Sequence, residues 1–219
     1  MNKNFLNALD DWGTILTDTY EESSKFIPET FKKNNNKIEV NSYEGVAINS
    51  NIEFPRNLNV IPQSSFKNST IIGELNIPDS VTFIGPDAFY NCNQITSIKL
   101  SNNIDTIYDR CFSNCANIEG QIEIPKSVNY IKTAAFYKCT KLETIVFNEG
   151  IIGISRNAFY GCTSLSGDII LPESLETMEN SAFSGCLNIN KIYISKNTKL
   201  YDVFSEGMDK EIKDKLIYY

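Results

Sequence analysis

Apolar positions recur along this chain with a period of 23 or 24 residues. The clearest copies are six short segments built around a phenylalanine, at Phe66, Phe89, Phe112, Phe136, Phe159 and Phe183. Tyr43 fits the same position one repeat earlier. A fixed period in the twenties is typical of a solenoid, in which each repeat forms one turn and packs only on its neighbours.

Each repeat also contains two apolar residues separated by a single position. These pairs are Leu75/Ile77, Ile98/Leu100, Ile122/Ile124, Ile145/Phe147, Ile169/Leu171 and Ile192/Ile194. Alternation with a period of two predicts a short strand with one buried face. A further aliphatic position follows each phenylalanine by six residues, as at Ile72 and Ile95. We therefore expect one short parallel strand per repeat, with turns, 3₁₀ segments or short strands on the convex side.

Proline and cysteine positions carry a resemblance to a known family. Ile77-Pro78-Asp79-Ser80-Val81 leads to Ala88-Phe89, and Ile124-Pro125-Lys126-Ser127-Val128 leads to Ala135-Phe136. This pattern, followed by Cys three residues after Phe, resembles the BspA-type leucine-rich repeat over roughly residues 40–204. The resemblance implies a leucine-rich-repeat solenoid. It also implies a microbial adhesin or interaction module, and similar repeats occur in viral and phage proteins.

The two ends lie outside the repeat and divide the chain into three parts. Residues 1–39 carry a helical stripe that predicts a helical arm or cap, and its members are Phe5, Leu9, Trp12, Leu16 and Tyr20. This segment either shields the first turn of the solenoid or docks on a partner or a second copy. Residues 40–204 form the solenoid. Residues 205–219 place Ile212, Leu216 and Ile217 among charges, which predicts a C-terminal helical cap.

Five of the six cysteines occupy one column of the repeat, three residues after each phenylalanine from Phe89 onward. Val46 and Ser69 hold that column in earlier turns, so we interpret it as a packing column in which Cys acts as a small apolar side chain. Cys111 replaces the Ala that precedes Phe elsewhere. Buried free thiols are expected, and a disulfide or a metal site are the alternatives.

Composition then excludes several classes of function. The chain has no histidine, which removes Ser-His-Asp and Cys-His catalysis and His-ligated metals. The net charge is −7, and the sequence has no basic patch of the kind that nucleic-acid binding requires. No apolar run is long enough to span a membrane, and the first residues do not resemble a signal peptide, which favours an intracellular or virion-associated protein. We expect no cofactor, no metal and no enzymatic activity.

The candidate binding surface is the outward side of the predicted sheet. The residues between and beside the buried pairs should face solvent on the concave side, and they are Glu53, Asn76, Lys99, Glu123, Val146, Ile170 and Tyr193. The apolar run Val146, Ile170 and Tyr193 suggests a partner-contact patch. The alternative is that these three residues are simply good strand formers.

Taken together, these patterns predict a non-enzymatic interaction module that binds protein or glycan. We favour a subunit of a larger assembly such as a virus or phage particle, which docks through the N-terminal arm, the concave sheet or both. A microbial cell-surface adhesin is the alternative. Homo- or hetero-oligomers would form through residues 1–39, with Phe5, Leu9, Trp12 and Leu16 as contacts.

Overall fold

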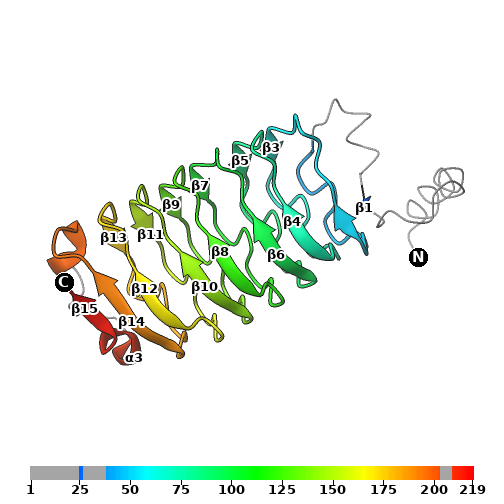
Figure 1. Ribbon diagram of the computed structural model, residues 1–219. Helices are drawn as coiled ribbons and strands as arrows, with labels where there is room; N and C mark the ends of the chain where they lie inside the picture. The colour runs from blue at the N-terminus through cyan, green and yellow to red at the C-terminus, as the bar shows by residue number, and fades with distance from the viewer. Residues whose placement is uncertain (1–24, 27–37, 203–208) are drawn as a thin grey trace, which may run out of the picture.

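The computed structural model describes residues 25–26, 38–202 and 209–219. This part of the chain winds into an elongated solenoid whose turns stack side by side (Figure 1). A first row of parallel strands runs along it, formed by β2 (Asn51–Ile52), β4 (Gly73–Asn76), β6 (Ile95–Lys99), β8 (Gly120–Glu123), β10 (Leu142–Val146), β12 (Gly167–Ile170) and β14 (Ile189–Ile194). The outward side of these strands, together with β15 (Leu216–Tyr218), is called the long-strand face below.

A second row of two-residue strands lies on the other side of the solenoid. Its members are β3 (Val60–Ile61), β5 (Phe83–Ile84), β7 (Thr106–Ile107), β9 (Tyr130–Ile131), β11 (Gly153–Ile154) and β13 (Thr177–Met178). The ladder β7-β9-β11-β13 is continuous, and β3 pairs with β5. At the first turn, β1 (Lys25–Phe26) pairs with β2. The 3₁₀ helix η1 (Lys199–Asp202) follows the last full turn. The predicted solenoid with parallel strands is confirmed.

The long strands pair in twos rather than forming one uniform ladder. β4 bonds to β6, β8 to β10 and β12 to β14, whereas β6 and β8 belong to separate sheets. The first strand of each pair begins at a glycine with positive φ, at Gly73, Gly120 and Gly167. The second strand contains one extra residue, which makes a bulge against the first. Because these glycines are 47 residues apart, the sheet repeats every two turns.

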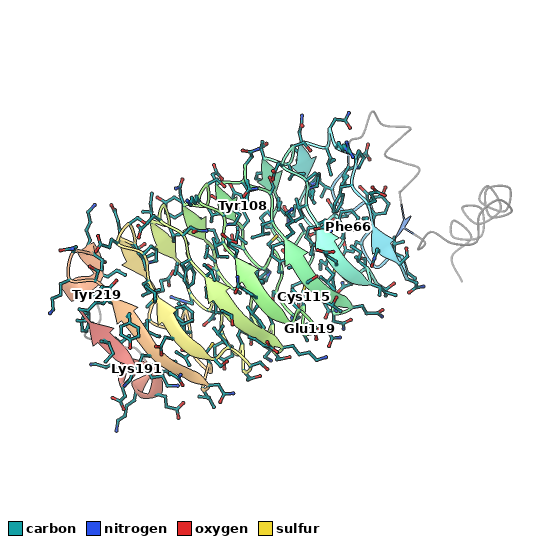
Figure 2. All side chains as sticks on the ribbon, viewed as in Figure 1. Phe66, Tyr108, Cys115, Glu119, Lys191 and Tyr219 are labelled. Carbon is teal, nitrogen blue, oxygen red and sulfur yellow. The ribbon has the colours of Figure 1, made fainter. Side chains whose placement is uncertain are left out.

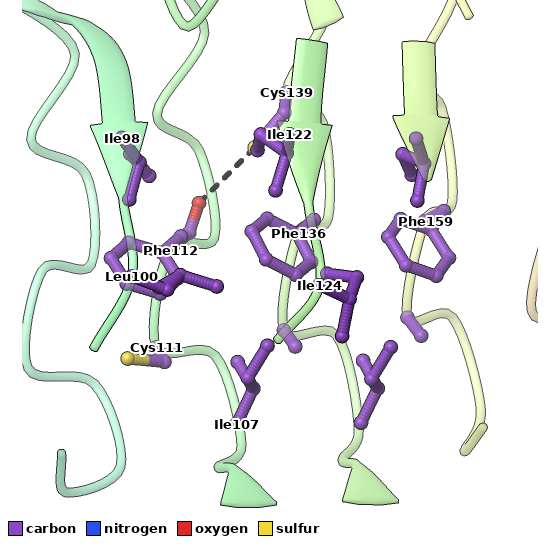
Figure 3. Packing of buried hydrophobic residues seen from close by; sticks show 14 of the residues in the cluster. Ile98, Leu100, Ile107, Cys111, Phe112, Ile122, Ile124, Phe136, Cys139 and Phe159 are labelled. Atoms are coloured by element: carbon purple, nitrogen blue, oxygen red, sulfur yellow. Dashed lines mark hydrogen bonds between the residues drawn. The ribbon is translucent and has the colours of Figure 1, made fainter. Parts of the chain in front are cut away.

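The phenylalanines form a continuous stack through the centre of the solenoid. Neighbouring ring centroids from Tyr43 to Phe183 lie 5.0–5.5 Å apart, with the planes within 14° of parallel. The six Phe rings are at most 1% exposed. Figure 3 shows Phe112, Phe136 and Phe159 in this stack, with Leu100, Ile122 and Ile124 of the sheet beside them. The stack is therefore the spine of the core, and each ring depends on the turns before and after it.

The cysteine column does more than fill space. Each thiol in the column donates a hydrogen bond to the carbonyl oxygen of the Phe one turn earlier, as from Cys92 to Phe66 at 2.9 Å and from Cys139 to Phe112 at 3.3 Å (Figure 3). Ser69 holds the column in an earlier turn, and its Oγ lies 3.4 Å from the Sγ of Cys92. All six cysteines are free and buried, as predicted. The column thus links successive turns through polar contacts that the packing interpretation did not include.

Two left-handed backbone positions flank most of the phenylalanines. The position two residues after the ring has positive φ at Gly45, Asn68, Asn91, Asn114, Lys138, Gly161 and Gly185. The position two residues before the ring has positive φ at Asn41, Ser64, Asp87, Arg110, Ala134 and Asn157. Gly and Asn tolerate this conformation better than other residues. The repeat turn therefore explains why Gly or Asn holds the position two residues after the ring in every turn except that of Lys138.

Two sequence-based expectations differ from the structure. Ile72 is 38% exposed, and Ile71 takes the core position that Ile72 was expected to hold. The repeat is one residue shorter here, because Gly73 follows Phe66 by seven residues whereas Gly120 and Gly167 follow Phe112 and Phe159 by eight. Among the described residues no helical cap is evident, and most of the predicted N-terminal one lies outside them. Residues 209–219 contain one helical turn, α3 (Lys210–Lys213), and then β15, which pairs parallel with β14. Of the helices that the structure describes, none has the length and apolar character needed to cross a bilayer.

Candidate functional site

The predicted patch lies on the long-strand face. Ile170 is directly opposite Tyr193 in the β12–β14 ladder, and Val146 occupies the same position at the end of β10. Ile170 is 63% exposed, whereas Val146 and Tyr193 are half-buried. An isoleucine this exposed on a strand gains little from burial within its own chain, so the three residues form an apolar surface that a partner could cover.

The C-terminal strand enlarges this surface. Ile217 of β15 pairs opposite Tyr193, and the ring of Tyr219 meets the ring of Tyr193 edge-on with centroids 6.3 Å apart. Tyr219 is 55% exposed and lies at the end of the sheet (Figure 2). We call Val146, Ile170, Tyr193, Ile217 and Tyr219 the apolar patch. Sequence reasoning missed its last two members because residues 205–219 were expected to form a helix.

Polar residues border the apolar patch. Asp168 and Lys191 are exposed and lie opposite each other in the β12–β14 ladder, and Thr144 is exposed on β10. An apolar centre with a polar rim is the usual arrangement of a protein–protein contact surface. The patch and its rim are therefore arranged as an interface and not as a continuation of the core.

Two polar grooves lie on the same face, where neighbouring pairs of strands belong to separate sheets and form no ladder with each other. The β2–β4 groove has a volume of about 480 Å³, and Glu53, Glu74, Asn76, Asp79 and Lys99 are among its lining residues. The β6–β8 groove has a volume of about 560 Å³, and Lys99, Gln121, Glu123, Lys126 and Asn148 are among its lining residues. These grooves follow from the two-turn period of the sheet, which the 23-residue repeat alone did not indicate.

Hydrogen bonds fix part of each groove. The backbone N–H and side-chain amide of Asn102 donate to Asp79, and these bonds hold the pKa of the Asp79 carboxyl below its usual range. In the other groove, the amide of Asn148 donates to Glu123 over 3.2 Å. Among the described residues, no hydrogen bond or ion pair engages the charged groups of Glu53, Glu74, Lys99 or Lys126. The charges of Glu53, Glu74 and Lys126 are available to a ligand, and that of Lys99 also acts on Asp79, whose carboxyl pKa it helps to lower.

Other tyrosines with exposed rings lie outside the long strands. Tyr130 is 37% exposed, and the ammonium of Lys132 lies 4.2 Å from its ring centroid. Tyr137 and Tyr160 stack with centroids 5.1 Å apart. These tyrosines already have partners within the chain, so they provide a natural control surface for the apolar patch.

The remaining predicted contacts fall outside the described residues. Phe5, Leu9, Trp12 and Leu16 lie in the segment 1–24, outside the described residues. Within the described ranges, no three Cys, Asp or Glu side chains converge so as to hold a metal ion. The long-strand face therefore carries the candidate site, and its chemistry is that of recognition by apolar contact, charge and hydrogen bonding.

Solved structures of similar shape are bacterial leucine-rich repeat proteins. One from Bacteroides ovatus has 24% identity and a TM-score of 0.63, with 80% of this chain and 49% of that chain covered. One from Eubacterium ventriosum has 24% identity and a TM-score of 0.56, with 61% and 36% covered. The pneumococcal vaccine antigen PcpA has 17% identity and a TM-score of 0.50, with 79% and 52% covered. At these identities the likeness shows the fold alone. The chain spans about half the length of the Bacteroides ovatus protein and of PcpA, and about a third of the Eubacterium ventriosum protein.

A family model gives the more specific result. The model of the BspA type leucine rich repeat region matches residues 13–142 and 117–206, with six copies. Curated protein sequences give no match. The matched residues include the phenylalanine stack, the cysteine column and the long strands described above. This chain therefore belongs to the family of proteins with BspA-type leucine-rich repeats.

Proposed function

We propose that this protein is a non-enzymatic module that binds another protein through the apolar patch on its long-strand face. BspA-type repeats suggest a role in protein–protein interaction or an adhesin-like role at a surface, and the repeat fold is typically a binding scaffold. No catalytic family matches the chain. The observation that carries the proposal is Ile170, which is 63% exposed between Val146 and Tyr193 on the long-strand face.

The composition of the patch supports protein rather than glycan as the partner. Ile170, Val146 and Ile217 offer aliphatic surface, and Tyr193 and Tyr219 add aromatic rings of the type enriched in interface hot spots. The two rings meet edge-on and are far from coplanar, so together they do not form one flat platform for a sugar. An aliphatic or aromatic side chain of a protein would fit this surface better.

Within this function, we propose a subunit of a larger assembly such as a virus or phage particle, which also docks through residues 1–39. A cell-surface adhesin domain is the alternative that the family favours. The two roles differ in what the protein does before it meets a ligand. An assembly subunit is held by its neighbours in the native source, whereas an adhesin domain is a monomer until its ligand is added.

Purification from the native source at low protein concentration tests this proposal. We expect the chain to elute with at least one other protein and to form cross-links to it from the β10–β15 end of the long-strand face. Lys191, on the rim, supplies a reactive amine for that cross-link. A monomer that cross-links to nothing until an extracellular ligand is added would support the adhesin instead. Cross-links confined to the tyrosine surface around Tyr130 would contradict the apolar patch as the binding site.

A further inference from the structure

Three junctions between strand pairs recur on the long-strand face, and they differ in chemistry at equivalent positions. The sheet repeats every 47 residues, so Glu53, Lys99 and Val146 hold equivalent positions. Glu53 and Lys99 are 46 residues apart, and Lys99 and Val146 are 47 apart. Their partners across each junction, Asn76, Glu123 and Ile170, are 47 residues apart. The face therefore presents two polar grooves and then an apolar junction in a fixed order along the solenoid.

The balance of charge differs in sign between the two grooves. The β2–β4 groove is lined by the carboxylates of Glu53, Glu74 and Asp79 against the ammonium of Lys99. The β6–β8 groove is lined by the ammonium groups of Lys126 and Lys99 against the carboxylate of Glu123, which stays charged because the amide of Asn148 that donates to it is neutral. A ligand that crosses the face would thus meet negative charge, then positive charge, then the apolar patch.

The spacing of the junctions limits the conformation of such a ligand. Two turns separate one junction from the next, and the rings of Phe66, Phe89 and Phe112 are 5.3 and 5.5 Å apart in succession, which gives about 11 Å. Hydrogen-bonded strands at ~4.8 Å would give about 10 Å. A polyproline II chain has three residues per turn and rises ~3.1 Å per residue, so it advances about 9 Å per turn and returns to the same face. A β-strand would point every third residue away from the surface, because its side chains alternate.

We propose that the partner contributes an extended peptide in the polyproline II conformation, which crosses the long-strand face perpendicular to the strands. A basic residue occupies the β2–β4 groove, an acidic residue three positions along occupies the β6–β8 groove, and an apolar residue three positions further covers Val146 and Ile170. This inference rests on the proposed protein-binding function and specifies the peptide that it recognises. Gln121 and Asn76 line the grooves and supply side-chain amides that can hydrogen-bond the backbone of a peptide that makes no internal hydrogen bonds.

Fluorescence anisotropy with short labelled peptides tests the spacing. The probes are KPADPAL and its reverse order LAPDAPK, because the peptide direction is open. Matched peptides shorten or lengthen each interval by one residue, and another pair exchanges Lys with Asp. We expect one of the two probes to bind, and we expect at least about a tenfold loss of affinity for the altered spacings and for the exchanged charges. Equal binding of all spacings, or no binding of either probe at millimolar concentration, would overturn the inference.

Charge reversal in the grooves tests the assignment of each position. In Glu53→Lys/Glu74→Lys the preference at the first position should change from Lys to Asp, and in Lys126→Glu the preference at the second position should change from Asp to Lys. Asp105→Lys, an exposed charge outside both grooves, should leave the preferences unchanged. If neither groove variant changes the preference, the inference fails. The proposed function would still stand if substitutions in the apolar patch abolish capture of the protein partner, so the two failures are distinguishable.

Discussion

The thiol of Cys115 donates a hydrogen bond to the carbonyl oxygen of Phe89, 3.1 Å away in the preceding turn. Cys111, four residues earlier, is equally buried but replaces an alanine, and no such bond is found for it among the described contacts. A comparison of these two cysteines therefore distinguishes the contribution of buried volume from that of the hydrogen bond within one turn of the solenoid.

We expect Cys115→Ala to lower the free energy of unfolding by about 1–2 kcal/mol, because it removes both the bond and buried volume. Cys115→Val should cost less, because valine fills the site without donating a bond, as Val46 does in the first turn. Cys111→Ala restores the residue found in other repeats and serves as the matched control. Urea denaturation measures all three. A loss in Cys111→Ala as large as that in Cys115→Ala would show that the hydrogen bond contributes nothing distinct.

Lys138 occupies a left-handed position, with φ at +55°, where the equivalent residues of the other repeats are Gly or Asn. Lys138→Gly should raise the free energy of unfolding by about 0.5–1 kcal/mol, because glycine adopts this conformation without strain. Gly161→Ala, the reverse change at φ +68°, should lower it by a similar amount. Thermal denaturation measures both variants. A loss of stability in Lys138→Gly would contradict the prediction that the backbone of Lys138 is strained.

Phe112 lies in the middle of the aromatic stack, with Phe89 and Phe136 each 5.5 Å away. Phe112→Ala should cost about 3–5 kcal/mol, because the ring is fully buried and its loss leaves a cavity between two turns. Since each turn contacts only its neighbours, we also expect the unfolding transition to broaden or split. Calorimetry detects this. Ile72→Ala, at an exposed isoleucine, should change stability by less than about 0.5 kcal/mol. A single sharp transition with little loss in Phe112→Ala would contradict the stack as the spine of the core.

The buried thiols predict a dependence of stability on pH. Burial raises the pKa of Cys92 to about 11 and that of Cys139 to about 12. The folded state keeps these thiols protonated, so their contribution to stability is complete below the unfolded pKa of about 8.5 and declines as pH rises toward the folded values. We expect the unfolding free energy to fall between roughly pH 8.5 and 11.

Thiol labelling provides a second measurement of the same burial. A disulfide reagent at pH 8 should react slowly with the folded chain and should titrate all six cysteines after unfolding in guanidinium. Rapid labelling of the folded chain would show that the cysteine column is open to solvent, and it would contradict the packing described here.

Most of the fold could be predicted from the sequence because each turn repeats the same contacts. The period of Phe66 to Phe183 gives the stack, and pairs such as Ile122 and Ile124 give the long strands. The strand β15 could not be predicted in this way. Its residues Leu216 and Ile217 are adjacent to charged positions that also fit a helix, and it forms a strand because β14 offers an edge with which it can pair.

The candidate site was only partly visible in the sequence. Val146, Ile170 and Tyr193 follow from the strand pattern, but Ile217 and Tyr219 depend on the pairing of β15. The two grooves depend on a 47-residue period that Gly73, Gly120 and Gly167 do show in the sequence. An alignment of single repeats does not reveal this period, because only every second repeat has the glycine.

The central claim is that the apolar patch on the long-strand face binds a protein. The most direct measurement compares wild type with Val146→Lys/Ile170→Lys/Tyr193→Glu and with the control Val60→Lys/Tyr130→Glu/Tyr160→Lys, which changes exposed apolar residues elsewhere on the solenoid. All three chains are immobilised at equal density after circular dichroism confirms that they fold, and proteins captured from the native source are quantified by mass spectrometry. We predict a partner that wild type and control retain equally and that the patch variant loses by at least about tenfold. Equal capture by the folded patch variant would contradict the claim.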